Sequence, residues 1–134
     1  MPNAESIAGT WRLSTYEVWT PEGQVSTPLG ASPVGYAVFD DTGHAFIQLA
    51  RSPDPETQEL DTEKIRASLA DSFTAYFGTY SVNAEGTKLT VRVEGSNRTP
   101  FVGSIQERMF SIAGATLTMG RPGQYRAVLS RQQP

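Results

Sequence analysis

The chain has 134 residues, a net charge of −3 and no cysteine, and its pI is near 5.1. This length suits one domain, residues 1–134, that buries a core without disulfides. The acidic balance and the lack of a basic stripe argue against a nucleic-acid partner, and one histidine without cysteine excludes a zinc site of soft ligands. The sequence contains no run of 18 apolar residues, so no membrane span is predicted. The N-terminus lacks the pattern of a signal peptide, so the expected location is the cytoplasm.

The first element is the stretch "GTWRLSTYEVW" at residues 9–19, which alternates as a strand does. Read by twos, one face carries Trp11, Glu17 and Trp19. If this heavier face is buried, the Glu17 carboxylate is buried with it, and it must then shift its pKa or find a partner.

Two further strands are predicted at residues 35–40 and 44–51, joined by a hairpin turn in "DDTG". The periodicity then changes. Ile65, Leu69 and Phe73 recur every four residues, which predicts one helix from Asp61 to about Thr74 with Asp61 as its N-cap.

The remainder of the chain returns to strand patterns separated by short turns. The predicted strands are residues 75–82, 88–96, 104–112, 116–120 and 124–131. Eight antiparallel strands with short connections favour an all-β fold, a closed eight-stranded barrel with one short α-helix between strands 3 and 4, because closure removes exposed edges. Such a barrel has room for one small ligand; the alternative is an open sandwich.

Alternation also predicts which side chains point into the barrel. Its aromatic contents are Trp19, Tyr76, Tyr80, Phe110 and Tyr125, and its polar contents are Glu17, Gln106 and Arg108. Arg108 is the expected partner of Glu17 because its planar fork matches a carboxylate. Two interpretations remain open: the pair fixes the strands in place, or it holds a polar ligand atom or moves a proton.

Tyr76 and Tyr80 lie two pleats apart on one face, with Gly78 between them. This spacing either presents two phenol hydroxyls to one ligand or places two core aromatic residues whose hydroxyls bond the backbone. Gly78 is expected to leave a gap in the wall where a ligand can approach the backbone.

Several stretches of the chain resemble one known family. "GTWRLSTYE", "PLGASPVGYAVFDDTGH", "AYFGTYSV" and "PFVGSIQERMF" are similar to segments of the bacterial and fungal lipocalin-like domain family, over about residues 9–131. The resemblance implies a lipocalin-type barrel in which Trp11 closes one end and packs on Arg131 from the last strand, as a cation–π pair.

Barrels related to this family divide between carriers of small apolar molecules and cofactor-free cyclases or isomerases of natural-product pathways. The first interpretation is therefore an enzyme without cofactor or metal, in which Glu17 is the acid or base and Tyr76 and Arg108 act on a carbonyl or enolate oxygen. The residues expected to contact the ligand are Trp19, Tyr80, Gln106, Phe110 and Tyr125. The alternative is a non-catalytic carrier, and in both cases the partner is a small hydrophobic or amphipathic molecule. A weaker third interpretation is a barrel filled by its own side chains.

Overall fold

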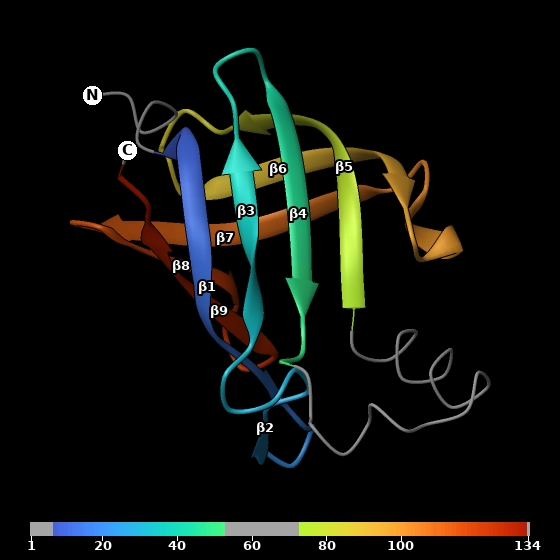
Figure 1. Ribbon diagram of the computed structural model, residues 1–134, viewed down its shortest axis with the longest axis vertical. Coiled ribbons are helices and arrows are strands. Elements are labelled where there is room, and N and C mark those ends of the chain that lie inside the picture. The colour runs from blue at the N-terminus through green and yellow to red at the C-terminus, as the bar shows by residue number, and fades with distance from the viewer. Residues whose placement is uncertain (1–6, 53–72, 134) are drawn as a thin grey trace.

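The computed structural model describes residues 7–52 and 73–133 (Figure 1). This part of the chain is built almost entirely from antiparallel strands, with one short 3₁₀ turn at Thr99–Phe101. The strands are β1 (Gly9–Trp19), β2 (Val25–Ser26), β3 (Val34–Phe39), β4 (His44–Ala50), β5 (Phe73–Val82), β6 (Lys88–Ser96), β7 (Ile105–Ala113), β8 (Thr116–Arg121) and β9 (Tyr125–Arg131). The predicted strand boundaries agree with these to within one or two residues.

The strands form a closed barrel. Each strand from β3 to β9 pairs with its neighbour in the chain, β1 pairs with β3, and β9 returns to pair with β1. The two-residue β2 only extends the edge of β1 at Val18 and Trp19, so eight strands make the wall. The predicted eight-stranded antiparallel barrel is confirmed, and the open sandwich is not formed.

The helix predicted from Asp61 to about Thr74 lies for the most part outside the described residues. Its last two residues, Phe73 and Thr74, are the first two residues of β5, where they pair with Ala50 and Leu49 of β4. Pairing with β4 therefore overrides the four-residue spacing that placed Phe73 on a helical stripe.

One end of the barrel is closed around Trp11, whose side chain is fully buried. The guanidinium of Arg131 lies 4.2 Å from the centre of its ring, which confirms the predicted cation–π pair. The indole nitrogen donates a hydrogen bond to the Ile7 carbonyl at 2.8 Å, and Arg131 donates to the Ala8 carbonyl at 2.9 Å. Gly9 has a φ of 133° and lies so close to Arg131 that a Cβ would stand 3.0 Å from its Nη1, so this corner suits only glycine.

A β-bulge in β1 decides which of its side chains enter the barrel. Leu13 pairs with Leu129 of β9, but Thr15 pairs with Val128, so Ser14 is an extra residue in the ladder. An extra residue places every later side chain of the strand on the face opposite to the one that simple alternation from Trp11 predicts. Trp11 and Leu13 therefore point inward before the bulge, whereas Tyr16 and Val18 line the interior after it.

The prediction that Glu17 points into the barrel and pairs with Arg108 is wrong, because it carried the alternation of Trp11 through the bulge. The Glu17 Oε1 atom instead accepts hydrogen bonds from Arg126 at 2.7 and 3.1 Å. The Arg126 side chain is 51% exposed, and its guanidinium lies 5.4 Å from the centre of the Trp19 ring. Trp19 therefore belongs to this outer cluster with Glu17 and Arg126, and its predicted place in the interior is also wrong.

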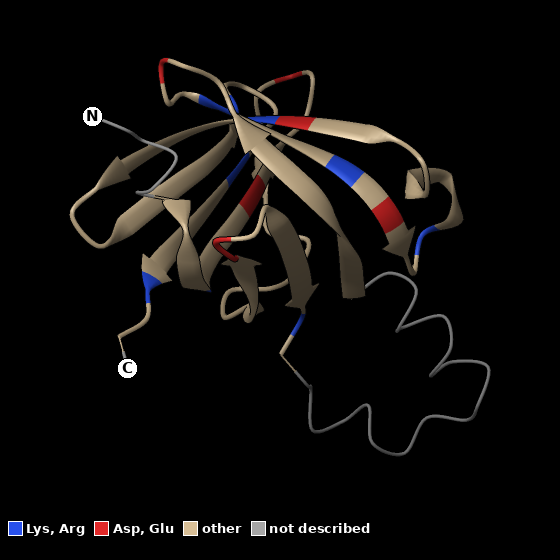
Figure 2. Ribbon diagram, turned by 90° about the horizontal axis from the view of Figure 1, so that it is seen from above, with Lys and Arg blue, Asp and Glu red and all other residues tan. Residues whose placement is uncertain are grey.

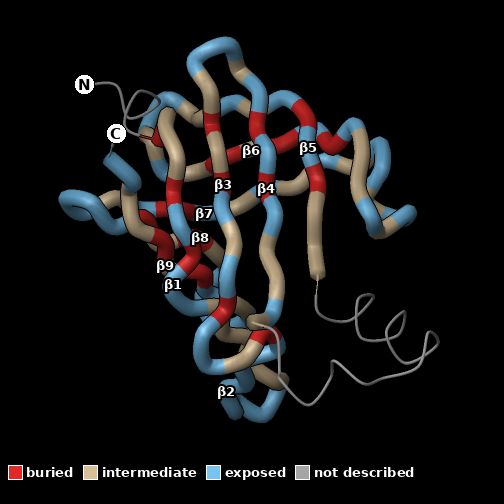
Figure 3. Tube along the Cα trace, viewed as in Figure 1, coloured by how far each residue is buried: buried red, intermediate tan, exposed pale blue. Residues whose placement is uncertain are grey.

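The remaining inward faces follow the predicted alternation. On β7 the side chains of Gln106, Arg108 and Phe110 are more buried than those of Ile105, Glu107 and Met109, which alternate with them. Buried positions on β3, β4 and β5 gather toward the closed end of the barrel (Figure 3). Basic and acidic positions are interspersed along the strands and turns (Figure 2). Toward the other end of the barrel, the positions on β3, β4 and β5 are half-buried or exposed.

Candidate functional site

The barrel encloses a cavity of about 320 Å³ between its closed end and the loops of the other end. This volume lies at the small end of the range for ligand sites, about 300–1,000 Å³. Aliphatic side chains form most of its wall, among them Leu13, Ile47, Met119, Ala127 and Leu129. Leu29, from the loop between β2 and β3, is 6% exposed and lines the same cavity.

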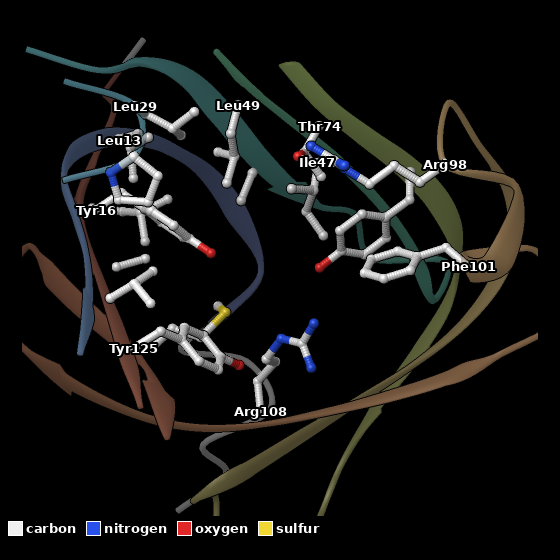
Figure 4. A pocket seen from close by; sticks show the side chains of 17 residues that line it. Leu13, Tyr16, Leu29, Ile47, Leu49, Thr74, Arg98, Phe101, Arg108 and Tyr125 are labelled. Atoms are coloured by element: carbon white, nitrogen blue, oxygen red, sulfur yellow. Dashed lines mark hydrogen bonds between the residues drawn. The ribbon is translucent and has the colours of Figure 1, made fainter. Parts of the chain in front are cut away.

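A polar group of side chains interrupts this apolar wall. Arg108 of β7, Tyr16 of β1, Tyr76 of β5 and Tyr125 of β9 come from four strands, and we call them the Arg108 cluster. Figure 4 shows Tyr16, Arg108 and Tyr125 reaching into the same space. The Tyr16 and Tyr125 rings are stacked with their centres 6.5 Å apart, and the Arg108 guanidinium lies 5.4 Å from the Tyr125 ring centre.

Neutral oxygen atoms hold Arg108 in place. Its Nη2 donates to the Gln106 side-chain oxygen at 3.0 Å, and its Nη1 donates to the Glu107 carbonyl at 3.0 Å. Gln106 is fixed in turn, since its amide nitrogen donates to Ser104 Oγ at 2.7 Å. Gln106 thus orients Arg108, and it is not among the residues that line the cavity.

The three phenols of the Arg108 cluster are proton donors at neutral pH. Burial raises the pKa of Tyr16, Tyr76 and Tyr125 above its ordinary value, and the positive charge of Arg108 opposes that rise at each of them. The same positive charge thus acts on all three hydroxyls.

The Tyr125 hydroxyl is buried and has no hydrogen-bond partner within the described part of the chain. A buried hydroxyl normally has a partner, because leaving it without one costs the free energy of its lost hydration. Here the unpaired donor lies on a cavity and beside a guanidinium. This arrangement is suited to a ligand that brings a hydrogen-bond acceptor.

A second arginine lines the rim of the cavity. Arg98 follows β6, and its Nε donates to Thr74 Oγ1 at 3.1 Å and its Nη2 to the Phe73 carbonyl at 3.5 Å. Next to it, Phe101 of the 3₁₀ turn packs edge-on against Tyr76, with ring centres 5.6 Å apart. The loop between β6 and β7 therefore supplies both a charge and an aromatic cover.

Arg108, Tyr76 and Tyr125 are the predicted site residues that the structure brings together at the cavity. Tyr80 points to the closed end, where its hydroxyl donates to the Asp40 carbonyl at 2.7 Å and its ring meets that of Phe39 edge-on. Tyr80 thus fits the alternative of a core aromatic residue bonded to backbone.

Two other expected features, the gap at Gly78 and the ring of Phe110, do not lie on this cavity. Gly78 leaves no gap for a ligand, because a Cβ there would collide with the Arg92 carbonyl of β6, next to a bulge in β6 at Glu94. Phe110 is 7% exposed and borders a second cavity of about 420 Å³, together with Trp19 and Arg126. Met119 and Tyr125 border both cavities.

Tyr16, Arg98 and Leu29 were not expected at the site. Tyr16 is placed there by the bulge at Ser14, which leaves no local mark in the sequence. Arg98 and Leu29 belong to loops, whose path depends on tertiary contacts.

Among the described residues, no group of three His, Asp or Glu side chains is placed to hold a metal ion. In the same part of the chain, no helix has the length and apolar character needed to cross a membrane.

A closed eight-stranded antiparallel barrel with an apolar cavity and a few convergent polar groups defines the class of lipocalin-type barrels, an architecture suited to holding a small molecule. The model of the Lipocalin-like domain family matches residues 8–132, nearly the whole chain, and the chain belongs to this family. No curated protein matches the sequence. Family membership supports small-molecule binding and does not specify the ligand.

Proposed function

We propose that this chain binds a small amphipathic molecule inside the barrel, with the apolar part against the aliphatic wall and a polar oxygen at the Arg108 cluster. The observation that carries this proposal is the buried Tyr125 hydroxyl, which has no partner among the described residues and lies on an apolar cavity beside Arg108. A ligand that accepts its hydrogen bond recovers the cost of leaving that donor unpaired.

A purely hydrocarbon ligand fits this wall less well. It would fill the space around Leu13, Ile47 and Leu129 but would leave the Tyr125 donor unpaired and remove any water from Arg108. Both effects oppose binding, whereas a ligand with one polar end avoids them.

The second candidate function is catalysis without a cofactor, as a cyclase or isomerase acting on a natural-product type of substrate. The observation that favours it is the position of the Tyr76 hydroxyl next to Arg108 on an apolar cavity, because these two groups can stabilise a developing enolate oxygen. Glu17 points outward and is held by Arg126, so it supplies no acid or base to this cavity. Tyr76, which burial keeps protonated, would be the proton donor in its place.

The cytoplasmic location expected from the sequence stays a prediction.

The test of binding uses N-phenyl-1-naphthylamine, an uncharged fluorescent probe whose emission rises in apolar surroundings. We expect saturable emission with the wild-type chain and loss of affinity in Ala127→Leu, which narrows the cavity. Ala127 is 7% exposed and lines the cavity, whereas Ala113 lies exposed on β7 and provides the matched control Ala113→Leu. Absence of a saturable signal, or equal affinity in the two variants, contradicts binding inside the barrel.

A second measurement separates the carrier from the enzyme. The molecule that copurifies with the chain is extracted, identified by mass spectrometry and added back to the purified protein. Recovery of the unchanged molecule supports the carrier, and its conversion to a cyclised or isomeric product of equal mass supports the enzyme.

A further inference from the structure

We propose that the polar end of the ligand is a carboxylate held by the Arg108 guanidinium and the Tyr125 hydroxyl, so that the ligand class is small amphipathic acids. This inference rests on the proposed binding function and narrows it from any acceptor group to an anion. It is carried by the balance of charge around the cavity and by the hydrogen-bond donors that line it.

The described part of the cavity wall carries positive charge. Arg98 and Arg108 both line it, and no aspartate or glutamate is among its described lining residues. The acid next to Arg108 in the chain, Glu107, is exposed and lies 3.5 Å from the ammonium of Lys88. The carboxylate expected to neutralise Arg108, that of Glu17, is bound to Arg126 outside the barrel.

The charge of Arg108 and part of its hydrogen-bonding capacity are available to a ligand. A guanidinium has five N–H donors, and its acceptors among the described residues, the Gln106 side-chain oxygen, the Glu107 carbonyl and the Tyr76 hydroxyl, are all neutral. A half-buried cation gains more from an anion than from neutral oxygens, because the interior screens charge poorly. A neutral carbonyl would satisfy Tyr125 but would leave this charge without a counter-ion among the described residues.

The phenols around Arg108 add donors and no negative charge. Burial keeps Tyr16, Tyr76 and Tyr125 protonated, so each presents an O–H rather than a phenolate. A carboxylate has only acceptor sites and can bind a guanidinium and a phenol at once. The remaining wall is aliphatic, which suits a hydrocarbon body attached to that group.

The experiment compares how well decanoate and decan-1-ol displace N-phenyl-1-naphthylamine at neutral pH, below the micelle-forming concentration of decanoate. The two molecules share a ten-carbon chain and differ in the charged end. We expect decanoate to displace the probe from the wild-type chain at a concentration lower by about tenfold or more, as expected for a hydrogen-bonded charge pair. Each result is expressed as the concentration of decan-1-ol that displaces the probe divided by the concentration of decanoate that does so. This ratio cancels changes in probe affinity between variants.

In Arg108→Gln this ratio should approach one. The matched control is Arg92→Gln, which removes the same charge from an exposed position on β6, and it should keep the wild-type ratio. Tyr125→Phe, which retains the ring, should lower the ratio by about threefold or more through loss of one hydrogen bond to a charged group. If Arg108→Gln does not fold, Tyr125→Phe and the wild-type ratio decide the question.

The outcomes separate the two proposals. A wild-type chain that binds the probe but is displaced equally by decanoate and decan-1-ol overturns the carboxylate assignment and leaves binding in place. A preference for decanoate that persists in both Arg108→Gln and Tyr125→Phe also overturns it. A chain that does not bind the probe contradicts the proposed function itself.

Discussion

Removing the Tyr125 hydroxyl should stabilise the ligand-free protein. Tyr125→Phe deletes one oxygen atom that is buried without a hydrogen-bond partner in the described structure. It keeps the stacking against Tyr16, at 6.5 Å between ring centres, and the contact with Arg108, at 5.4 Å. The substitution therefore removes a desolvation cost and no favourable contact that the structure shows.

The size of the effect follows from the cost of an unpaired buried polar group, about 1–3 kcal/mol. Part of that cost is recovered if water enters the cavity beside Tyr125, so the lower end applies, about 1 kcal/mol. For a domain of this length, that change raises the melting temperature by about 3–5 °C.

The assay is thermal unfolding of the ligand-free protein followed by circular dichroism, with Tyr80→Phe as the matched control. The Tyr80 hydroxyl donates to the Asp40 carbonyl at 2.7 Å, so its removal should cost about 0.5–1.5 kcal/mol. The two substitutions delete the same atom and should shift the melting temperature in opposite directions. A loss of stability in Tyr125→Phe equal to that in Tyr80→Phe would refute the view that the Tyr125 hydroxyl is unpaired.

Two further predictions concern β1 on either side of its bulge. Trp11→Ala should lower the free energy of unfolding by about 3–5 kcal/mol, since it truncates a fully buried indole that packs on Arg131; an unchanged denaturant midpoint would contradict its role in closing the barrel. Glu17→Gln should change stability by less than about 1 kcal/mol, because the Glu17–Arg126 pair is partly exposed. It should leave the affinity for N-phenyl-1-naphthylamine unchanged, and a clear loss of affinity would indicate that Glu17 reaches the cavity after all.

The sequence by itself determined the strands and the barrel, because both depend on local patterns. Alternation of apolar and polar residues marks each strand, and turns such as the one at Gly43, where φ is 90°, mark where the chain reverses. The inward faces of β7 and β9 followed from the same alternation, which is why Arg108 and Tyr125 were correctly expected inside. The pairing of Trp11 with Arg131 came from the family resemblance.

Only the tertiary structure decided which side chains of β1 face the cavity. The extra residue at Ser14 exists only in the pairing of β1 with β9 and follows from no period within β1 itself. This one residue moved Glu17 to the outer wall and brought Tyr16 to the Arg108 cluster. The charge of the cavity was decided in the same way, because the partner of each arginine depends on which strand lies beside it: Arg126 faces Glu17 across the β1–β9 pairing, whereas Arg108 faces the cavity with neutral oxygens as its partners.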